Sequence, residues 1–379
     1  MVALGAMHAG WGLTPHEAFA AVEPNTIGLL LGMMLLAAGL AEAGFFDAAG
    51  SWLVGRALSP VRLLYAITIG AGVLSALLVN DSVCLLGAPI VDRTARRAGL
   101  ARGPYLLALA MGSNAGSAMT LAGNPQNMLV GQLSGIDYRS YLLRAGPAGL
   151  LALATTAAVL HAMMRRRLQR AAPEAPVDEP RLSSARPAVS LRAAFVCLLA
   201  VSVSFLLGAN LAWTALAGAM AMMMIRGRDA TPLFEHVAWT VLIFFAALFV
   251  VVAGLHKTGL PATALEATRP YMPTGEIAST FALSGLLLIG CQIVSNVPLI
   301  ALVHGWIASQ PDPTTAWLVT ALVTTLAGNL TLLGSVANII VIETAGPDHD
   351  VGFVSYLKAG VPVTLASTAV ALIYLLITG

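Results

Sequence analysis

The chain has 379 residues, of which 58% are hydrophobic and 10% are charged, and its mean hydropathy is +0.83. A soluble domain carries about 25% charged residues, so this composition excludes a soluble globular protein and predicts an all-α polytopic membrane protein. The net charge of +2 and three widely separated cysteines indicate no nucleic-acid surface, disulfide framework or zinc site.

Apolar runs follow one another along the chain, and a run of about 20 residues is long enough to span a bilayer. The first run is short and lacks a basic leader, so we expect a spanning helix without its start rather than a signal peptide. The runs lie near residues 1–12, 25–43, 63–91, 103–130, 142–163, 190–207, 211–225, 238–255, 277–303, 314–342 and 359–377.

A charged, proline-rich stretch divides the chain. Residues 165–189 contain "RRRLQRAAPEAPVDEPRLSSARP", which is incompatible with a bilayer core, so they are predicted to form a solvated linker. The arginines of this linker place it in the cytoplasm under the positive-inside rule. The predicted domains are therefore a first membrane repeat at 1–164 and a second, inverted repeat at 190–379.

The apolar run 63–91 carries a polar interruption, and arginines flank it on both sides. Both of its ends should therefore face the cytoplasm, which predicts a re-entrant hairpin with Asn80, Asp81 and Ser82 at its tip. Asp81 is the only acid far from the ends of an apolar core, where a charge costs several kcal/mol unless it is compensated. Asp81 is therefore either a proton-titrating group or cation ligand, or a structural acid held by backbone amides.

The run 277–303 is predicted to be the inverted counterpart of this hairpin. Counting the spans forward from the cytoplasmic linker, this run starts and ends outside the cytoplasm. The loop that follows it, "HGWIASQPDP", contains no lysine or arginine, as the positive-inside rule requires. Its tip holds Ser295 and Asn296. Aligning "ALLVNDSVCLLGAPIV" with "QIVSNVPLIALVHGWI" places Asn80 on Asn296.

Two further runs are interrupted by glycine and asparagine. "TLAGNPQNMLV" at 120–130 aligns with "TLLGSVANIIV" at 331–341, and hydrocarbon cannot satisfy the backbone groups that such breaks release. The two hairpins and two broken transmembrane helices together predict an inverted-topology repeat. Half-helices that meet near the midplane present positive ends to an anion and unwound carbonyls to a cation. The alternative is a kinked helix with tightly packed glycines and asparagines bonded to neighbours.

The predicted site residues lie at the two tips and the two breaks. Asn114 and Asn329 precede the breaks and either line the site or bond helix to helix. The predicted substrate and ion ligands are Asn80, Asp81, Ser82, Thr120, Gly123, Asn124, Asn127, Ser295, Asn296, Thr331, Gly334, Ser335 and Asn338.

No enzyme constellation occurs in the sequence, and we expect no cofactor beyond a coupling ion, H⁺ or Na⁺. The chain lacks a Walker A motif, which argues against an ATP-driven pump, although a separate ATPase partner could supply energy. We predict an ion-coupled secondary transporter that moves a small anionic solute by alternating access. The alternatives are a sodium/proton antiporter on the same scaffold and, less favoured, an ion channel.

These motifs resemble the ion transporter superfamily. "VNDSVCLLGAPIV", "LAGNPQNMLVG", "SNVP" and "GNLTLLGSVANIIV" are similar to the tips and breaks of citrate-transporter-like permeases, close to arsenite-efflux permeases, the melanosomal P protein and related sodium/proton antiporters. The resemblance implies a bacterial inner-membrane protein with a dimerising scaffold domain and a moving transport domain. It also implies sodium sites near Asn80 and Gly123 and near Asn296 and Gly334, with substrate between the tips.

Overall fold

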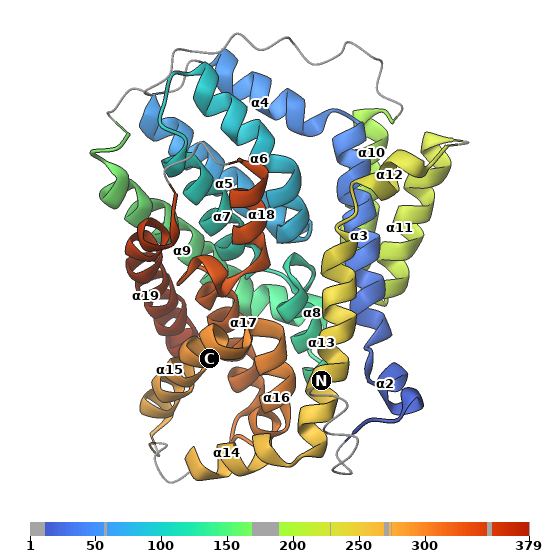
Figure 1. Ribbon diagram of the computed structural model, residues 1–379, viewed down its shortest axis with the longest axis vertical. Helices are drawn as coiled ribbons and strands as arrows, with labels where there is room; N and C mark the ends of the chain where they lie inside the picture. Colours follow the sequence, from blue (N-terminus) through green and yellow to red (C-terminus); the bar gives the residue numbers. More distant parts are fainter. Residues whose placement is uncertain are drawn as a thin grey trace.

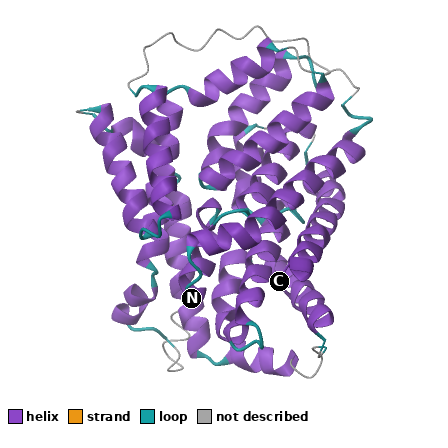
Figure 2. Ribbon diagram, turned by 180° about the vertical axis from the view of Figure 1, so that it is seen from behind, coloured by secondary structure: helices purple, strands orange, loops and turns teal. Residues whose placement is uncertain are grey.

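A computed structural model describes residues 12–56, 59–168, 189–227, 229–268, 273, 275–346 and 351–378. These residues form helices and loops without a strand (Figures 1 and 2). Residues 1–11 of the first apolar run and residues 169–188 of the linker lie outside the described part. The incomplete first helix and the boundaries of the linker and of the two repeats therefore stay predictions.

Several helices have the length and composition of membrane spans, which confirms the membrane class. Large apolar side chains such as Ile69, Leu150, Ile243, Ile289 and Ile373 are exposed on most of them, as lipid contact requires. Within the described residues six such spans are found: α3 (Pro24–Glu42), α5 (Pro60–Leu77), α9 (Tyr138–Met164), α13 (Trp239–Lys257), Ile277–Val294 of α15 (Glu276–Val294), and α19 (Phe353–Thr378).

The first repeat follows the predicted order. After α3 come a helix across the end of the bundle, a hairpin, a broken helix and the long α9. The remaining elements are α2 (Pro15–Ala21), α4 (Phe45–Gly55), α6 (Asn80–Arg97), α7 (Gly103–Ser117), the 3₁₀ turn η1 (Leu121–Gly123) and α8 (Pro125–Ser134).

The second repeat has the same order of elements, entered through α10 and α11. Here α13 and α14 correspond to α3 and α4, the second hairpin follows them, and α19 corresponds to α9. The elements are α10 (Leu191–Leu206), α11 (Leu211–Arg226), α12 (Thr231–Glu235), α14 (Leu260–Thr268), α16 (Asn296–Ala308), α17 (Pro313–Ala327), η3 (Leu332–Gly334) and α18 (Val336–Thr344).

The two copies point in opposite directions. Figure 1 shows α4 and the open end of the first hairpin at one end of the bundle, and α14 and the open end of the second hairpin at the other. We call the end that carries α4 and the end of α9 the linker face, and the other end the far face. This arrangement confirms the inverted repeat with two re-entrant hairpins and two broken helices.

The hairpins are longer than the apolar runs that predicted them. The first extends from Pro60 to Arg97 rather than over 63–91, because the charges at its end are paired. Asp92 lies 2.9 Å from Arg96 Nε and 2.7 Å from Arg102 Nε. Ion pairs at the rim of the bilayer thus let α6 continue past its apolar part.

The helices form two groups that lie side by side. α3 packs with α10–α13 in what we call the lateral group, and the hairpins, broken helices, α9 and α19 form the central group (Figures 1 and 2). Glycines allow the closest approach within the central group. A Cβ on Gly116 of α7 would lie 2.2 Å from Gly72 Cα of α5, and one on Gly112 would lie 2.5 Å from the Thr68 carbonyl. The GxxxG spacing of α7 therefore brings two backbones into contact.

The hairpin topology can be tested by cysteine labelling in a background without the native cysteines. Single cysteines at Arg56 and Arg97 should react with an impermeant reagent from the same membrane face. Matched single cysteines at Gly275 and Ser309, the ends of the second hairpin, should react only from the other face. Labelling of positions 56 and 97 from opposite faces would remove the re-entrant hairpin and the inverted repeat with it.

Candidate functional site

Both predicted breaks are present and have the same backbone form. After α7 the chain is extended at Thr120, makes the turn η1, and is extended again at Asn124 before Pro125 begins α8. After α17 the same sequence recurs, with Thr331 and Ser335 as the extended residues around η3. The second break has this form without a proline, so Pro125 is not needed for the helix to break in this way.

One asparagine in each copy satisfies the carbonyls that the break releases. Asn127 Nδ2 donates to the carbonyls of Ser117 at 3.2 Å and Thr120 at 3.0 Å. Asn338 Nδ2 donates to the carbonyls of Gly328 at 2.7 Å and Thr331 at 3.1 Å. Unwound carbonyls were expected to be open to a cation, whereas these four each accept a hydrogen bond from a carboxamide. An unpaired carbonyl would be costly at this depth.

The oxygen of each of these carboxamides is bonded by the other repeat. Thr325 Oγ1 donates to Asn127 Oδ1 at 3.0 Å, and Asn114 Nδ2 donates to Asn338 Oδ1 at 2.9 Å. Asn114 and Thr325 occupy equivalent positions in the aligned repeats. The two breaks are therefore joined by a reciprocal pair of hydrogen bonds about a pseudo-twofold axis.

A second reciprocal pair extends this network. Asn124 Nδ2 donates to Thr325 Oγ1 at 3.1 Å, and Ser335 Oγ donates to Asn114 Oδ1 at 3.2 Å. Asn114 Nδ2 also donates to Asn329 Oδ1 at 3.0 Å. All of these side chains are buried or half-buried. Asn114 and Asn329 thus bond helix to helix, the alternative that the sequence left open.

Each hairpin is tied to the break of its own repeat. Thr120 Oγ1 donates to the Ala76 carbonyl at 2.7 Å, and Thr331 Oγ1 donates to Gln292 Oε1 at 2.8 Å. Ala76 and Gln292 are equivalent in the alignment of the two tips. Gln292 was not among the predicted site residues. Its alignment with Ala76, four residues before the tip asparagine, was the only sequence feature that could have indicated its role.

The two tip asparagines share an unusual property. Asn80 Nδ2 donates to Asn114 Oδ1 at 3.0 Å, but Asn80 Oδ1 has no hydrogen-bond partner among the described residues. Asn296 Oδ1 likewise has none, and the two residues are 2% and 5% exposed. Buried carbonyl oxygens without partners are ligands that a hard cation can use.

Asp81 and Ser82 lie in the first turn of α6, beside the tip. Both are buried, at 3% and 4% exposure, and neither side chain makes a hydrogen bond or ion pair with the described residues. The positive end of the helix favours the Asp81 carboxylate, whereas burial favours its neutral form. No backbone amide of the described chain bonds to the Asp81 side chain, and its role as a proton-titrating group or cation ligand stays a prediction. Its counterpart Val297 is apolar, so this acid belongs to one repeat only.

Ser295 marks the second tip by its backbone. Its φ of +69° makes it the one non-glycine residue of the described chain in the left-handed region. Such a conformation costs about 1–3 kcal/mol and persists where the surroundings demand it, often at functional sites. Its side chain is half-buried and does not cap α16.

The predicted glycines lie where the backbone folds on itself. A Cβ on Gly123 would lie 2.3 Å from the Ser117 carbonyl oxygen. One on Gly334 would lie 3.1 Å from the carbonyl oxygens of Ala327 and Gly328. Both glycines are therefore explained by close packing, which does not depend on a ligand.

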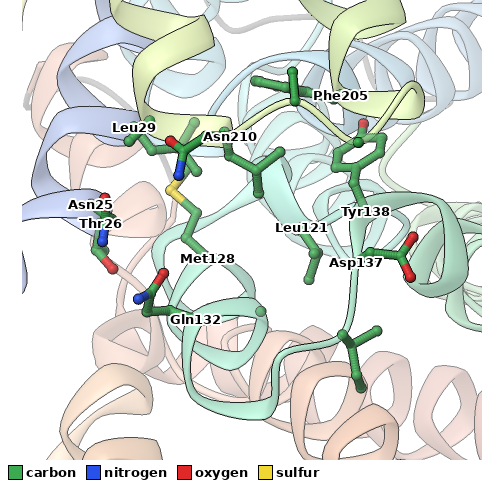
Figure 3. A pocket seen from close by; sticks show the side chains of 16 residues that line it. Asn25, Thr26, Leu29, Leu121, Met128, Gln132, Asp137, Tyr138, Phe205 and Asn210 are labelled. Atoms are coloured by element: carbon green, nitrogen blue, oxygen red, sulfur yellow. The ribbon is translucent and has the colours of Figure 1, made fainter.

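A cavity of about 200 Å³ lies beside the first break, between the lateral and central groups (Figure 3). Leu121 of η1 and Met128 of α8 line it from one side, and Asn25 and Thr26 of α3 line it from the other. Thr26 is 2% exposed and its hydroxyl has no partner in the described chain. No predicted site residue lines this cavity, and an isolated threonine near a helix start gave no sequence signal.

The reciprocal network predicts a specific stability effect. Thr325→Val should destabilise the protein by about 1–3 kcal/mol, because Asn127 Oδ1 loses its donor and Asn124 Nδ2 its acceptor. Thr320→Val is the matched control, since Thr320 is equally buried but bonds only to the Ala316 carbonyl of its own helix. Unfolding of the purified variants in detergent compares them, and equal midpoints would contradict the role given to Thr325.

Comparison with known proteins places these motifs in a family. The citrate transporter family, CitMHS, matches residues 1–327. The silicon efflux transporter LSI3 of Oryza sativa subsp. japonica is 29% identical over 426 residues, covering 95% of this chain and 88% of that protein. A Dictyostelium discoideum protein named "Putative transporter arsB" is 23% identical, and the match covers 93% of this chain and 82% of that protein.

The fold also recurs in a solved structure. The YdaH transporter of Alcanivorax borkumensis matches with a TM-score of 0.62 at 14% identity, covering 94% of this chain and 85% of that chain. Together, the inverted hairpins, the paired breaks and the match over most of the sequence show that this chain is a membrane transporter of the citrate transporter family.

Proposed function

We propose that the chain is an ion-coupled secondary transporter that moves a small solute across a bacterial inner membrane by alternating access. The observation that carries the proposal is the pair of buried, unpartnered oxygens on Asn80 and Asn296 at the tips of two inverted hairpins. Inverted repeats that each carry such a tip and meet at their breaks suit a site approached from either face in turn. Family membership supports a transport function.

The proposed solute is a small anion. Four half-helices, α6, α8, α16 and α18, begin at the tips and breaks, and their positive ends favour negative charge. The silicon in the name of the rice relative and the citrate in the description of the family suggest oxygen-rich solutes of low mass, which amide and hydroxyl groups can bind. Asparagine, serine and threonine supply both donors and acceptors for such a solute.

The proposed coupling ion is H⁺ or Na⁺. Asp81 supplies the single deep carboxylate, and no lysine or arginine pairs with it in the described chain. A carboxylate in this setting can exchange a proton or complete a sodium shell with amide oxygens. We favour the proton role, because the second tip has Val297 where a matching acid would be needed for a symmetric cation site.

A sodium/proton antiporter is the second candidate function. The same groups, the unpartnered amide oxygens and the lone carboxylate, could bind a cation even if no anionic solute is carried. A channel fits less well, because channels build rings of carbonyls or charges along a pore.

We also propose a homodimer through the lateral group, where Trp213, Met220 and Met224 of α11 are 72%, 63% and 79% exposed.

Uptake into vesicles tests the function directly. Reconstituted protein should accumulate solute against its gradient when a pH or sodium gradient is imposed, with citrate and sulfate as anionic probes and with arsenite and silicic acid as oxygen-rich probes that are largely uncharged near neutral pH. Accumulation of none of these, together with ²²Na⁺ movement driven by a pH gradient, would favour the antiporter. Passive flux that never exceeds equilibrium would point to a channel.

The role of the carboxylate has its own test. Asp81→Asn keeps the size and hydrogen-bonding capacity of the side chain but removes titration. Solute exchange at equal pH should persist, while accumulation driven by a pH gradient should be lost. If Asp81 instead binds sodium, the variant should mainly raise the sodium concentration needed for half-maximal transport. Accumulation with unchanged pH and sodium dependence would contradict both roles.

A further inference from the structure

An apolar groove of about 630 Å³ opens between α4 and the first hairpin, and residues of α6 from Val83 to Val91 contribute to its lining. Helix α4 forms one wall with Trp52, helix α5 forms the floor with Tyr65, Ile69 and Val73, and α6 closes the groove with Ile90. Figure 1 shows α4 lying across the linker face above α5 and α6. The groove therefore begins at the membrane surface under α4.

Small residues keep the groove open. Ala49 of α4 and Ala66 and Gly70 of α5 line it, and a Cβ on Gly70 would meet no atom within 4 Å, whereas one on Gly50 would lie 2.5 Å from Ile90 Cγ2 where α4 packs on α6. From Tyr65 to Val73 the helix rises by about 12 Å, so the groove reaches from the interface toward the bilayer interior. A space of this shape and chemistry accepts a hydrocarbon chain.

The mouth of the groove is basic and aromatic. The Arg56 guanidinium lies 5.1 Å from the centre of the Trp52 ring, and Trp52 lines the groove. Tyr65 OH, also in the lining, is 3.2 Å from His161 Nδ1. Arg62 is exposed and lies one turn before Ala66 on α5. Aromatic rings and arginines at this depth are the groups that meet lipid headgroups, and the arginines favour an anionic one.

We propose that this groove binds one acyl chain of an anionic phospholipid from the linker-face leaflet, with the headgroup phosphate held at Arg56 and Arg62. The charge at the mouth selects an anionic lipid over a zwitterionic one. Because α4 joins α3 to the first hairpin, the bound chain lies between elements that must shift if the central group moves. The proposal is independent of which solute is carried.

Fluorescence quenching in vesicles tests this site, because Trp52 lines the groove. The chain has six tryptophans, so a variant with Trp52 alone and a control variant with Trp239 alone can be made. Trp239 is 46% exposed at the start of α13 in the lateral group. Brominated phosphatidylglycerol in a phosphatidylcholine bilayer should quench Trp52 more than its mole fraction predicts. We expect a preference of about fivefold at Trp52 and little at Trp239.

Two sets of variants separate headgroup from chain. Arg56→Gln with Arg62→Gln should abolish the preference for phosphatidylglycerol, and a preference that persists would overturn the headgroup assignment. Gly70→Phe should fill the groove and lower quenching by either lipid. Its control is Gly285→Phe on α15, where a Cβ also meets nothing within 4 Å. Should Gly70→Phe fold poorly, Ala66→Leu replaces it, and unchanged quenching in a folded groove variant would overturn the site.

Discussion

The carboxamides of Asn127 and Asn338 resolve the constraint on which the rest of the structure depends. A helix that stops halfway across a bilayer leaves carbonyl groups that lipid cannot bond. Each carboxamide bonds two of these carbonyls within its own repeat, and each carboxamide oxygen is bonded from the opposite repeat by Asn114 or Thr325. The side chain that satisfies each break is therefore itself held in place by the opposite repeat. This dependence explains why two inverted copies, rather than one, form the centre of the molecule.

The polar groups at the breaks have hydrogen-bond partners, whereas several polar groups at the hairpin tips have none among the described residues. Among the described residues, the side-chain oxygens of Asn80 and Asn296 have no partner and no group pairs with Asp81, while Ser295 holds a strained backbone. Fully bonded polar networks are rigid. A buried polar group without a partner instead raises the free energy of the folded protein until a ligand bonds to it. The division between a saturated network at the breaks and unsaturated tips suggests that the breaks hold the structure and that the tips bind what is carried.

The sequence predicted the fold class, the hairpins and the breaks because each depends on local patterns: apolar length, flanking arginines and glycine within an apolar run. The internal alignment was also sufficient to pair Asn80 with Asn296 and Asn127 with Asn338. It could not predict that the carboxamide oxygens of Asn127 and Asn338 accept hydrogen bonds from Thr325 and Asn114, because those bonds depend on how the second repeat packs against the first. Thr325, Gln292 and Thr26 were missed for the same reason, since isolated threonine and glutamine residues acquire their roles only through contacts distant in sequence.

Alternating access of the tips is the central claim of this account, and Ser295 offers the most direct measurement. A single cysteine at position 295, in a background without the native cysteines, can be exposed to an impermeant thiol reagent in right-side-out and inside-out vesicles. The account predicts labelling from both faces, with the balance between the faces shifted by an imposed pH or sodium gradient. Labelling confined to one face under every gradient would contradict alternating access at this tip.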